Sequence, residues 1–357
     1  MSPTIFIYIA VGLVLLTVGA DWLVRGASRL ATRFGISPLI VGLTVVAFGT
    51  SAPEMAVSVK AAWNGVGDIA VGNVVGSNIF NVLGILGCSA LVIPLLVSRQ
   101  LVRFDVPVMI AATVLAFALA LDQHYGRLDG ALLFAGVLAY TAFLIHTARK
   151  ERNTDVATPE PTAKVGRNLF LIAIGLVFLV LGAQALVEGA TELARALGLS
   201  DLVIGLTIVA VGTSLPELAT SVVAAIRGER DIAVGNIVGS NIFNLLAVLG
   251  LASLVSPNPI SVSPNALGLD FPVMLAIAVA CLPIFYAGYK VSRFEGGVFL
   301  AYYLAYVAYL ILFSTGRPQA QSLSDAMLYI ALPVTVFWIL LQAARAFKRG
   351  PANGVHP

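Results

Sequence analysis

Charged side chains are scarce in this 357-residue sequence, and their scarcity excludes an ordinary water-soluble domain. Asp, Glu, Lys and Arg supply 11% of the residues, whereas soluble domains contain roughly 25%. Hydrophobic residues make up 59%, and the mean hydropathy is +0.95. The net charge of +3 gives no indication of nucleic-acid binding, so we expect no nucleic-acid partner.

Histidine and cysteine are also rare, which narrows the possible metal chemistry. The three histidines lie at positions 124, 146 and 356, outside any motif, and no His-x-x-x-His pair exists. A zinc metalloprotease site is therefore excluded. Cys88 and Cys281 lie in apolar stretches, where we expect small buried side chains that carry no information about the redox compartment.

Long apolar stretches recur along the whole chain. About 20 apolar residues in a helix cross the ~30 Å hydrocarbon core of a bilayer. Eleven windows meet this length, at about 3–24, 38–60, 69–95, 104–121, 128–148, 168–190, 200–226, 231–255, 269–288, 294–314 and 325–345. The sequence therefore predicts an all-α, polytopic membrane protein whose surroundings are the lipid bilayer.

The sequence repeats itself. Shifting the chain by 163 residues places 37–84 on 200–247 without a gap, with 32 identities in 48 positions, and the flanking windows match as well. We predict two repeats of five transmembrane helices, with an extra helix after them. The expected boundaries are a first repeat at 1–148, a cytoplasmic linker at 149–166, a second repeat at 167–315 and the extra helix at 324–347.

Five helices per repeat is an odd number, so the second repeat should be inverted relative to the first. With the N-terminus outside, 17 of the 21 Lys and Arg residues fall on the cytoplasmic side, as the positive-inside rule requires. Arg25 and Arg29 are replaced by Glu188 and Glu192 at the equivalent positions of the second repeat. We therefore expect a multi-pass protein of the inner, cytoplasmic cell membrane, with its C-terminus inside.

A carboxylate interrupts the second apolar window, in the motif GTSAPE at 49–54, and GTSLPE at 212–217 repeats it. A charge at the centre of a membrane helix costs roughly 2.5–3.5 kcal/mol on insertion scales, so such residues are usually functional. Pro53 should break or kink the helix and free carbonyl groups near Ala47. Helical spacing turns the oxygens of Thr50, Ser51 and Glu54 to one side.

The following window of each repeat carries a stripe of polar residues at four-residue spacing. The stripe consists of Asn73, Ser77 and Asn81 in the first repeat and of Asn236, Ser240 and Asn244 in the second. Glycines beside each stripe, among them Gly72 and Gly76, should allow close helix approach. Isolated Ser, Thr or Asn residues in a membrane helix usually only form hydrogen bonds between helices.

Because the motifs occur twice in an inverted repeat, we favour a cation site at the repeat interface. Two carboxylates with neutral oxygens, and neither His nor Cys, suit Ca²⁺, Mg²⁺ or Na⁺. Six to eight flexible oxygen ligands fit Ca²⁺ better than Mg²⁺. A channel is less favoured, since buried paired carboxylates suit tight binding rather than rapid release.

Other acidic residues receive structural interpretations. Asp21 is expected to pair with Arg25, four residues later. Four further aspartates precede apolar windows and are expected to cap helices, namely Asp68, Asp105, Asp231 and Asp270.

The doubled pair GTSAPE…GSNIFN and GTSLPE…GSNIFN resembles the two alpha repeats of the sodium/calcium exchanger family, prokaryotic type, within the cation/Ca²⁺ antiporter superfamily. The resemblance covers nearly the whole chain except the last helix. It implies a transporter rather than an enzyme, which exchanges Na⁺ for Ca²⁺ by alternating access and needs no cofactor. A proton- or Na⁺-coupled antiporter of another divalent cation on the same fold is the alternative.

The resemblance also implies a ligand set. Glu54 and Glu217 would bridge Ca²⁺ together with Thr50 and Thr213. Two flanking Na⁺ sites would use the carbonyls of Ala47 and Ala210 with the hydroxyls of Ser51, Ser77, Ser214 and Ser240. Asn81 and Asn244 complete the set, and asparagine rather than aspartate at position 244 resembles the potassium-independent branch. With two formal negative charges, a three-to-one exchange would be electrogenic. The sequence does not determine the oligomeric state.

Overall fold

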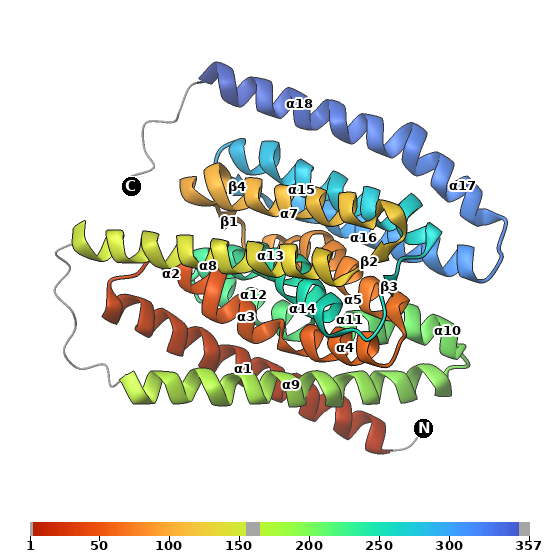
Figure 1. Ribbon diagram of the computed structural model, residues 1–357, viewed down its shortest axis with the longest axis horizontal. Coiled ribbons are helices and arrows are strands. Elements are labelled where there is room, and N and C mark those ends of the chain that lie inside the picture. The colour runs from red at the N-terminus through yellow and green to blue at the C-terminus, as the bar shows by residue number, and fades with distance from the viewer. Residues whose placement is uncertain (1–2, 155–164, 350–357) are drawn as a thin grey trace.

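The computed structural model describes residues 3–154 and 165–349, and its long elements are all helices (Figure 1). The elements of the first repeat are α1 (Pro3–Phe34), α2 (Pro38–Val41), η1 (Gly42–Val46), α3 (Ala47–Thr50), α4 (Ala52–Trp63), α5 (Gly67–Phe80), η2 (Asn81–Leu86), α6 (Gly87–Val92), β1 (Leu95–Leu96), η3 (Leu101–Asp105), α7 (Val106–Leu119), η4 (Ala120–Asp122), β2 (His124–Tyr125) and α8 (Arg127–Thr154).

The second repeat follows the same order. Its elements, with the extra helix, are α9 (Val165–Ala196), α10 (Asp201–Ile204), η5 (Gly205–Val209), α11 (Ala210–Gly212), α12 (Leu215–Ile226), α13 (Arg230–Phe243), η6 (Asn244–Val248), α14 (Leu249–Val255), β3 (Ile260–Ser261), η7 (Ala266–Asp270), α15 (Phe271–Tyr286), β4 (Lys290–Val291), α16 (Arg293–Ser314), α17 (Gln319–Ala326), η8 (Met327–Ala331) and α18 (Leu332–Arg349). The predicted linker is described only at its ends, because residues 155–164 lie outside the described residues, as do 350–357.

The predicted polytopic helical membrane protein is confirmed. In the described chain, nine helices are long and apolar enough to cross a bilayer, or ten when Pro38–Thr50 and Ala52–Trp63, bent by 46°, are taken as one span. The window at 200–226 is the exception, because it does not form one continuous helix. It breaks before α12, which is a shorter apolar helix of its own. Both exceptions are the segments that carry the Gly-Thr-Ser-x-Pro-Glu motifs.

Two short strand pairs support the inversion of the second repeat. β1 pairs antiparallel with β4, and β2 pairs with β3. β1 follows the third span of its repeat and β4 the fourth, and the same holds for β3 and β2. Each pair thus joins non-equivalent loops of the two repeats. Loops that pair must lie on the same side of the membrane, so one repeat is inverted relative to the other.

α1 and α9 form a closely packed antiparallel pair along one edge of the molecule (Figure 1). Glycines seven residues apart bring the two backbones together: a Cβ atom added at Gly12 would lie 2.9 Å from the Gly182 oxygen, and one added at Gly19 would lie 2.7 Å from the Gly175 oxygen. Small residues permit this approach where lipid supplies no hydrophobic driving force. The pair therefore behaves as one packing unit.

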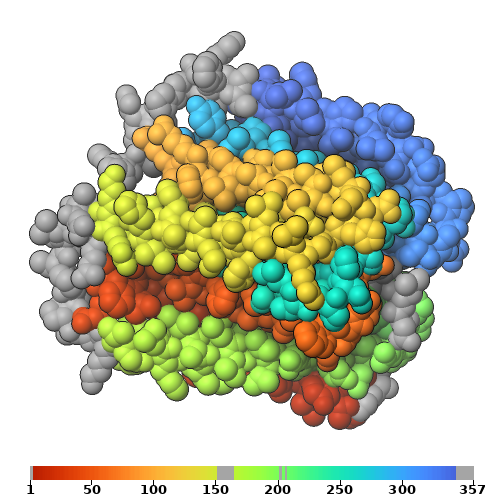
Figure 2. Space-filling model, viewed as in Figure 1, coloured from red at the N-terminus to blue at the C-terminus, as the bar shows by residue number. Residues whose placement is uncertain are grey.

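The third span of each repeat lies at the centre of the bundle. In Gly67–Val92, 83% of the most apolar window is buried inside the protein, and in Arg230–Val255 the share is 89%. The extra helix, Gln319–Gln342, has only 6% of its window buried. It lies at the edge opposite α9 (Figure 2) and is held by a hydrogen bond of 2.6 Å between the hydroxyls of Tyr302 and Thr335. The two polar stripes therefore lie on the most buried spans of the described protein.

The prediction that four aspartates cap helices is wrong. Asp68 and Asp231 lie inside the first turns of α5 and α13, where the cap positions are Val66 and Glu229. Two further aspartates sit within continuous helix and accept hydrogen bonds from tyrosine hydroxyls, in the pairs Asp105–Tyr140 (3.0 Å) and Asp270–Tyr306 (2.8 Å). In each pair a tyrosine donates to one carboxylate oxygen, a contact that no local sequence pattern could assign.

Candidate cation-binding site

Both Gly-Thr-Ser-x-Pro-Glu motifs lie where a helix breaks. In the first repeat, α3 ends at Thr50, Ser51 has ψ near 6°, and α4 restarts at Ala52 with a 46° change of direction. In the second repeat, Ser214 has ψ near 9° and α12 begins at Leu215. Proline follows one residue into each new helix, where it needs no amide partner. The break expected at Pro53 is thus confirmed.

The two glutamates lie in the first turns of α4 and α12, and both are fully buried. Each accepts a hydrogen bond from the serine of the other repeat. Ser214 Oγ donates to Glu54 Oε1 at 2.8 Å, and Ser51 Oγ donates to Glu217 Oε1 at 3.0 Å. Ser214 also lies 3.0 Å from the Ser77 hydroxyl. The two motifs, 163 residues apart in sequence, therefore form one cluster.

A second pair of residues fastens each broken helix to the centre of the bundle. Thr213 donates to Asn73 Oδ1 at 3.2 Å, and Thr50 donates to Asn236 Oδ1 at 3.1 Å. Asn73 Nδ2 in turn donates to the Glu54 backbone oxygen at 3.3 Å, with the equivalent contact from Asn236 at 3.4 Å. The asparagines therefore position both the threonines and the backbone that carries the glutamates.

These asparagines were part of the predicted polar stripes but not of the predicted ligand set. Ser58 and Ser221, which receive hydrogen bonds from Asn73 and Asn236 at 2.9 and 3.0 Å, were missed as well. The identity between the repeats could have revealed these residues, because Ser58 and Asn73 recur 163 positions later as Ser221 and Asn236.

Several buried polar atoms in the cluster lack a hydrogen-bond partner among the described residues. They include Oε2 of Glu54 and Glu217, both polar atoms of the Asn81 amide, Oδ1 of Asn244 and the hydroxyl of Ser240. A buried unsatisfied polar atom costs about 1–3 kcal/mol, so a group of them needs a compensating ligand. Asn81 and Asn244 each begin a π-helical turn, a feature frequent at functional sites.

The backbone carbonyls differ from expectation in the first repeat. The Ala47 oxygen accepts the Ser51 amide at 3.0 Å and the Thr50 hydroxyl at 3.4 Å, so it is not freed by Pro53. In the second repeat the Ser214 amide donates to Val211 at 3.1 Å instead of to Ala210. The break is therefore wider in the second repeat. Ala210 in that repeat is exposed, whereas the equivalent Ala47 in the first repeat is buried.

The structure thus connects most of the predicted site. Direct hydrogen bonds link Thr50 with Ala47, and link Ser51, Glu54, Ser77, Ser214 and Glu217 across the repeats, while Thr213 joins through Asn73. Ser240, Asn81 and Ala210 make no such side-chain contact with the others among the described residues, and Asn244 instead contacts Asn78. In the described parts of the chain, no three His, Cys, Asp or Glu side chains lie together so that they could hold a metal ion. Any cation here would depend on two carboxylates supplemented by hydroxyl, amide and carbonyl oxygens.

The two repeats are not packed identically around this cluster. A Cβ atom at Gly235 or Gly239 would lie 3.0 and 2.8 Å from Leu39 and Ala47, so α13 touches the second span of the first repeat. At the equivalent Gly72 and Gly76, no described atom lies within 4 Å, contrary to the predicted close approach. Val46 is completely buried, whereas Val209, its equivalent, is 49% exposed. The cluster is therefore more open toward the side where α5 and α10 begin.

The opposite side is closed by polar contacts between α1 and the end of α12. Asp21 forms ion pairs with Arg25 at 2.9 Å, as predicted, and with Arg227. Ser28 donates a hydrogen bond to Glu229 at 2.5 Å. The equivalent positions in the opposite repeat are Gln184 and Thr191 for Asp21 and Ser28, and Asn64 and Val66 for Arg227 and Glu229, and these residues cannot form the ion pair.

Comparison with known proteins supplies the family. The family model described as sodium/calcium exchanger protein matches residues 4–146 and 167–312. A putative antiporter, CaxA, from Alkalimonas amylolytica is 41% identical over 84% of this chain and 96% of its own length. The sodium/calcium exchanger MaX1 from Methanosarcina acetivorans is 35% identical over 85% of this chain and 98% of its own. A structure of the sodium-calcium exchanger NCX_Mj, soaked with Na⁺ and Ca²⁺, superposes with a TM-score of 0.75 and 32% identity, covering 86% of this chain and 99% of that one. The chain therefore belongs to the sodium/calcium exchanger family of membrane antiporters.

Proposed function

We propose that this protein exchanges Na⁺ for Ca²⁺ across the membrane by alternating access, electrogenically and without K⁺. The observation that carries the proposal is the buried pair Glu54 and Glu217, each held by a serine of the other repeat and each retaining an unpartnered oxygen among the described residues. A dehydrated Ca²⁺ needs carboxylate oxygens of this kind in a flexible shell. The names of MaX1 and NCX_Mj, both sodium/calcium exchangers, agree with this chemistry.

The proposed ligands keep the symmetry of the repeats. Ca²⁺ would lie between Glu54 and Glu217 with Thr50 and Thr213. Two Na⁺ sites would flank it, and their ligands would be the carbonyls of Ala47 and Ala210, the hydroxyls of Ser51, Ser77, Ser214 and Ser240, and the amides of Asn81 and Asn244. In the present conformation Ala210 is exposed, whereas Ala47 is buried.

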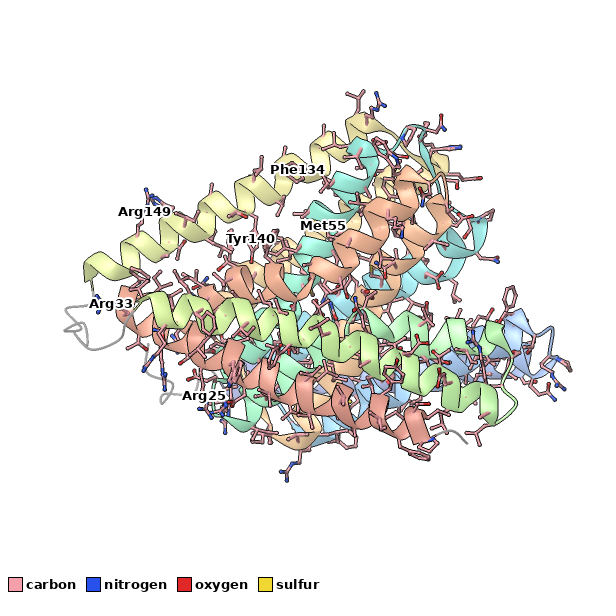
Figure 3. All side chains as sticks on the ribbon, turned by 90° about the horizontal axis from the view of Figure 1, so that it is seen from below. Arg25, Arg33, Met55, Phe134, Tyr140 and Arg149 are labelled. Atoms are coloured by element: carbon pink, nitrogen blue, oxygen red, sulfur yellow. The ribbon has the colours of Figure 1, made fainter. Side chains whose placement is uncertain are left out.

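The membrane orientation follows from the charges. Arg33 and Arg149 lie at the same end of the molecule (Figure 3), which supports an inner side carrying the ends of α1 and α8. We propose the inner, cytoplasmic cell membrane, with the N-terminus outside and the C-terminus in the cytoplasm. On this orientation the open side of the cation site faces outward.

Ca²⁺ uptake into proteoliposomes tests the proposed coupling. Vesicles loaded with Na⁺ and diluted into Na⁺-free and K⁺-free choline buffer should accumulate ⁴⁵Ca²⁺, because the outward Na⁺ gradient drives exchange. Adding K⁺ to both sides should leave the initial rate unchanged. Uptake that follows a pH gradient instead would favour the proton-coupled alternative. Na⁺-driven uptake of another divalent cation, with no uptake of Ca²⁺, would show that this other cation is the substrate.

Membrane potential tests the stoichiometry. Two carboxylates are neutralised by one Ca²⁺, whereas three Na⁺ leave one excess positive charge, worth ~2.3 kcal/mol per 100 mV. An inside-positive potential, set with valinomycin and external K⁺, should therefore accelerate Ca²⁺ uptake into Na⁺-loaded vesicles. A rate that is independent of the potential would indicate two Na⁺ per Ca²⁺.

Alternating access also requires the closed side to open. The ion pair of Asp21 with Arg227 and the hydrogen bond of Ser28 with Glu229 tie α1, and with it α9, to the inner end of α12 and the residues that follow it. A groove lies beside them, lined by Thr17, Val18, Asp21, Trp22, Val223, Ile226 and Arg227. Partly exposed polar contacts such as these contribute at most about 1 kcal/mol each to the free energy of the closed conformation. This is enough to bias the equilibrium between the two access states, and little enough for the contacts to break in each transport cycle.

We expect Arg227→Gln to shift the protein toward inner access. With Cys88 and Cys281 replaced by alanine, a single cysteine at Val46 should react about fivefold faster with a thiol reagent in this variant. A single cysteine at Val209 should react more slowly, because the outer opening is less populated. Arg230→Gln removes a nearby charge outside the contact and should change neither rate. Equal acceleration at both positions would show general loosening and contradict the prediction.

A further inference from the structure

Asn78 and Asn241, which precede the π-helical turns, are absent from the proposed ligand set, yet both are buried and polar. Asn78 lies on α5 and contacts α13, where the two central helices meet. Its Nδ2 donates to the backbone oxygen of Asn241 at 3.2 Å, and its Oδ1 accepts a hydrogen bond from Asn244 Nδ2 at 3.2 Å. One side chain thus joins the two repeats and touches a proposed ligand.

The direction of these hydrogen bonds follows from simple chemistry. A backbone carbonyl can only accept, so the nitrogen of the Asn78 amide must face Asn241. Its oxygen must then face Asn244, and the Asn244 amide must present its nitrogen to that oxygen. The remaining atom, Asn244 Oδ1, is buried and has no partner among the described residues.

This orientation matters for a cation. An asparagine amide that turns its oxygen toward a cation is a ligand, whereas the flipped amide presents two N–H donors and repels it. Asn236 and Ser240 on α13 and Asn244 at the start of η6 follow one another at four-residue spacing, and Asn236 contacts Thr50 and the Glu217 backbone. Asn244 therefore lies on the face of the proposed site, and its free oxygen is the atom suited to bind.

We infer that Asn78 is a positioning residue, which fixes the amide of Asn244 so that its oxygen is available to the transported cation. The inference rests on the proposed function, because it assumes that Asn244 is a ligand. Asn78 itself need not touch the ion.

The equivalent residue in the other repeat does not act in this way in the present conformation. Asn241 Nδ2 donates to Ile237 O in its own helix at 3.0 Å, and both polar atoms of the Asn81 amide lack a partner among the described residues. Of the equivalent residues Asn81 and Asn244, only Asn244 is therefore held by an asparagine of the other repeat in the described structure. This difference between two identical sequence positions supplies a matched control.

A double-mutant cycle on the full-length protein tests the inference, with Ca²⁺ alone as the probe. The apparent Ca²⁺ affinity is measured from Ca²⁺-dependent thermal stabilisation of the purified protein in Na⁺-free buffer. Asn78→Ala should weaken the affinity about tenfold when Asn244 is present, and less than about twofold in an Asn244→Ala background. Asn241→Ala should have the same small effect in both backgrounds.

The cycle separates positioning from a purely structural role. Loss of stability without Ca²⁺ would be similar in both backgrounds, whereas a positioning effect on Ca²⁺ affinity disappears once Asn244 is gone. If the alanine variant does not fold, Asn78→Leu retains side-chain volume while removing both hydrogen bonds. An unchanged affinity in Asn78→Ala, or an equal loss in both backgrounds, overturns the inference. An unchanged affinity in Asn244→Ala removes Asn244 from the ligand set and the inference with it, while the role of Glu54 and Glu217 is tested separately.

Discussion

Replacing Glu54 or Glu217 with glutamine should abolish Na⁺-driven Ca²⁺ uptake. Glutamine keeps the size of the side chain and one acceptor oxygen, but it removes half of the formal negative charge of the site. For a divalent cation and one negative charge at about 2.4 Å, the lost attraction amounts to about 14 kcal/mol at an effective dielectric constant of about 20. Even partial compensation leaves a fall of more than about 100-fold in the initial rate of ⁴⁵Ca²⁺ uptake.

The same variants should remain folded. Both glutamates are completely buried and accept hydrogen bonds from serine hydroxyls without a positively charged partner among these contacts, so neutral side chains remove a desolvation cost. The melting temperature without Ca²⁺ should be unchanged or higher, and stabilisation by Ca²⁺ should be lost. Glu188→Gln, at an exposed position of α9, removes a charge elsewhere and should retain uptake. Wild-type uptake in either site variant would exclude that glutamate from the site.

Substitution of Gly175 by alanine should disrupt the pairing of α1 with α9. The new Cβ would lie 2.8 Å from both the Gly19 oxygen and the Leu23 nitrogen, which are backbone atoms and cannot rotate away. Overpacking of this kind costs about 1–3 kcal/mol, which exceeds the roughly 1 kcal/mol that alanine gains over glycine in a helix interior. We expect a lower melting temperature and a several-fold slower exchange, because α1 and α9 can no longer move as one unit.

Gly166→Ala is the matched control for this prediction, since it makes the same substitution in the same helix. No described atom lies within 4 Å of a Cβ added at Gly166. Its melting temperature and exchange rate should therefore stay close to those of the wild type. If Gly175→Ala is as well tolerated as Gly166→Ala, the close glycine contact is not required for stability or transport.

Much of the site could be predicted because its polar side chains belong to short motifs that occur in both repeats. Glu54 must find compensation in an apolar segment, and its recurrence as Glu217 in an inverted repeat leaves the repeat interface as the meeting place. The hydrogen bonds from Ser214 to Glu54 and from Ser51 to Glu217 match that expectation. The tyrosine partners of Asp105 and Asp270 could not be predicted, because they come from helices about 35 residues later in the chain.

The sequence by itself determined the membrane class, the two inverted repeats and the residue types that meet at their interface, because hydropathy, spacing and internal identity are properties of the chain. Only the tertiary structure decided how two nearly identical segments differ. Val46 is buried and Val209 exposed, and Asn78 holds Asn244 while Asn241 bonds its own helix. The physical reason is that a symmetric sequence permits two packings in which the two repeats exchange roles. An ion pair can tie α1 to α12, but none can tie α9 to α4, because Asn64 takes the place of Arg227 there.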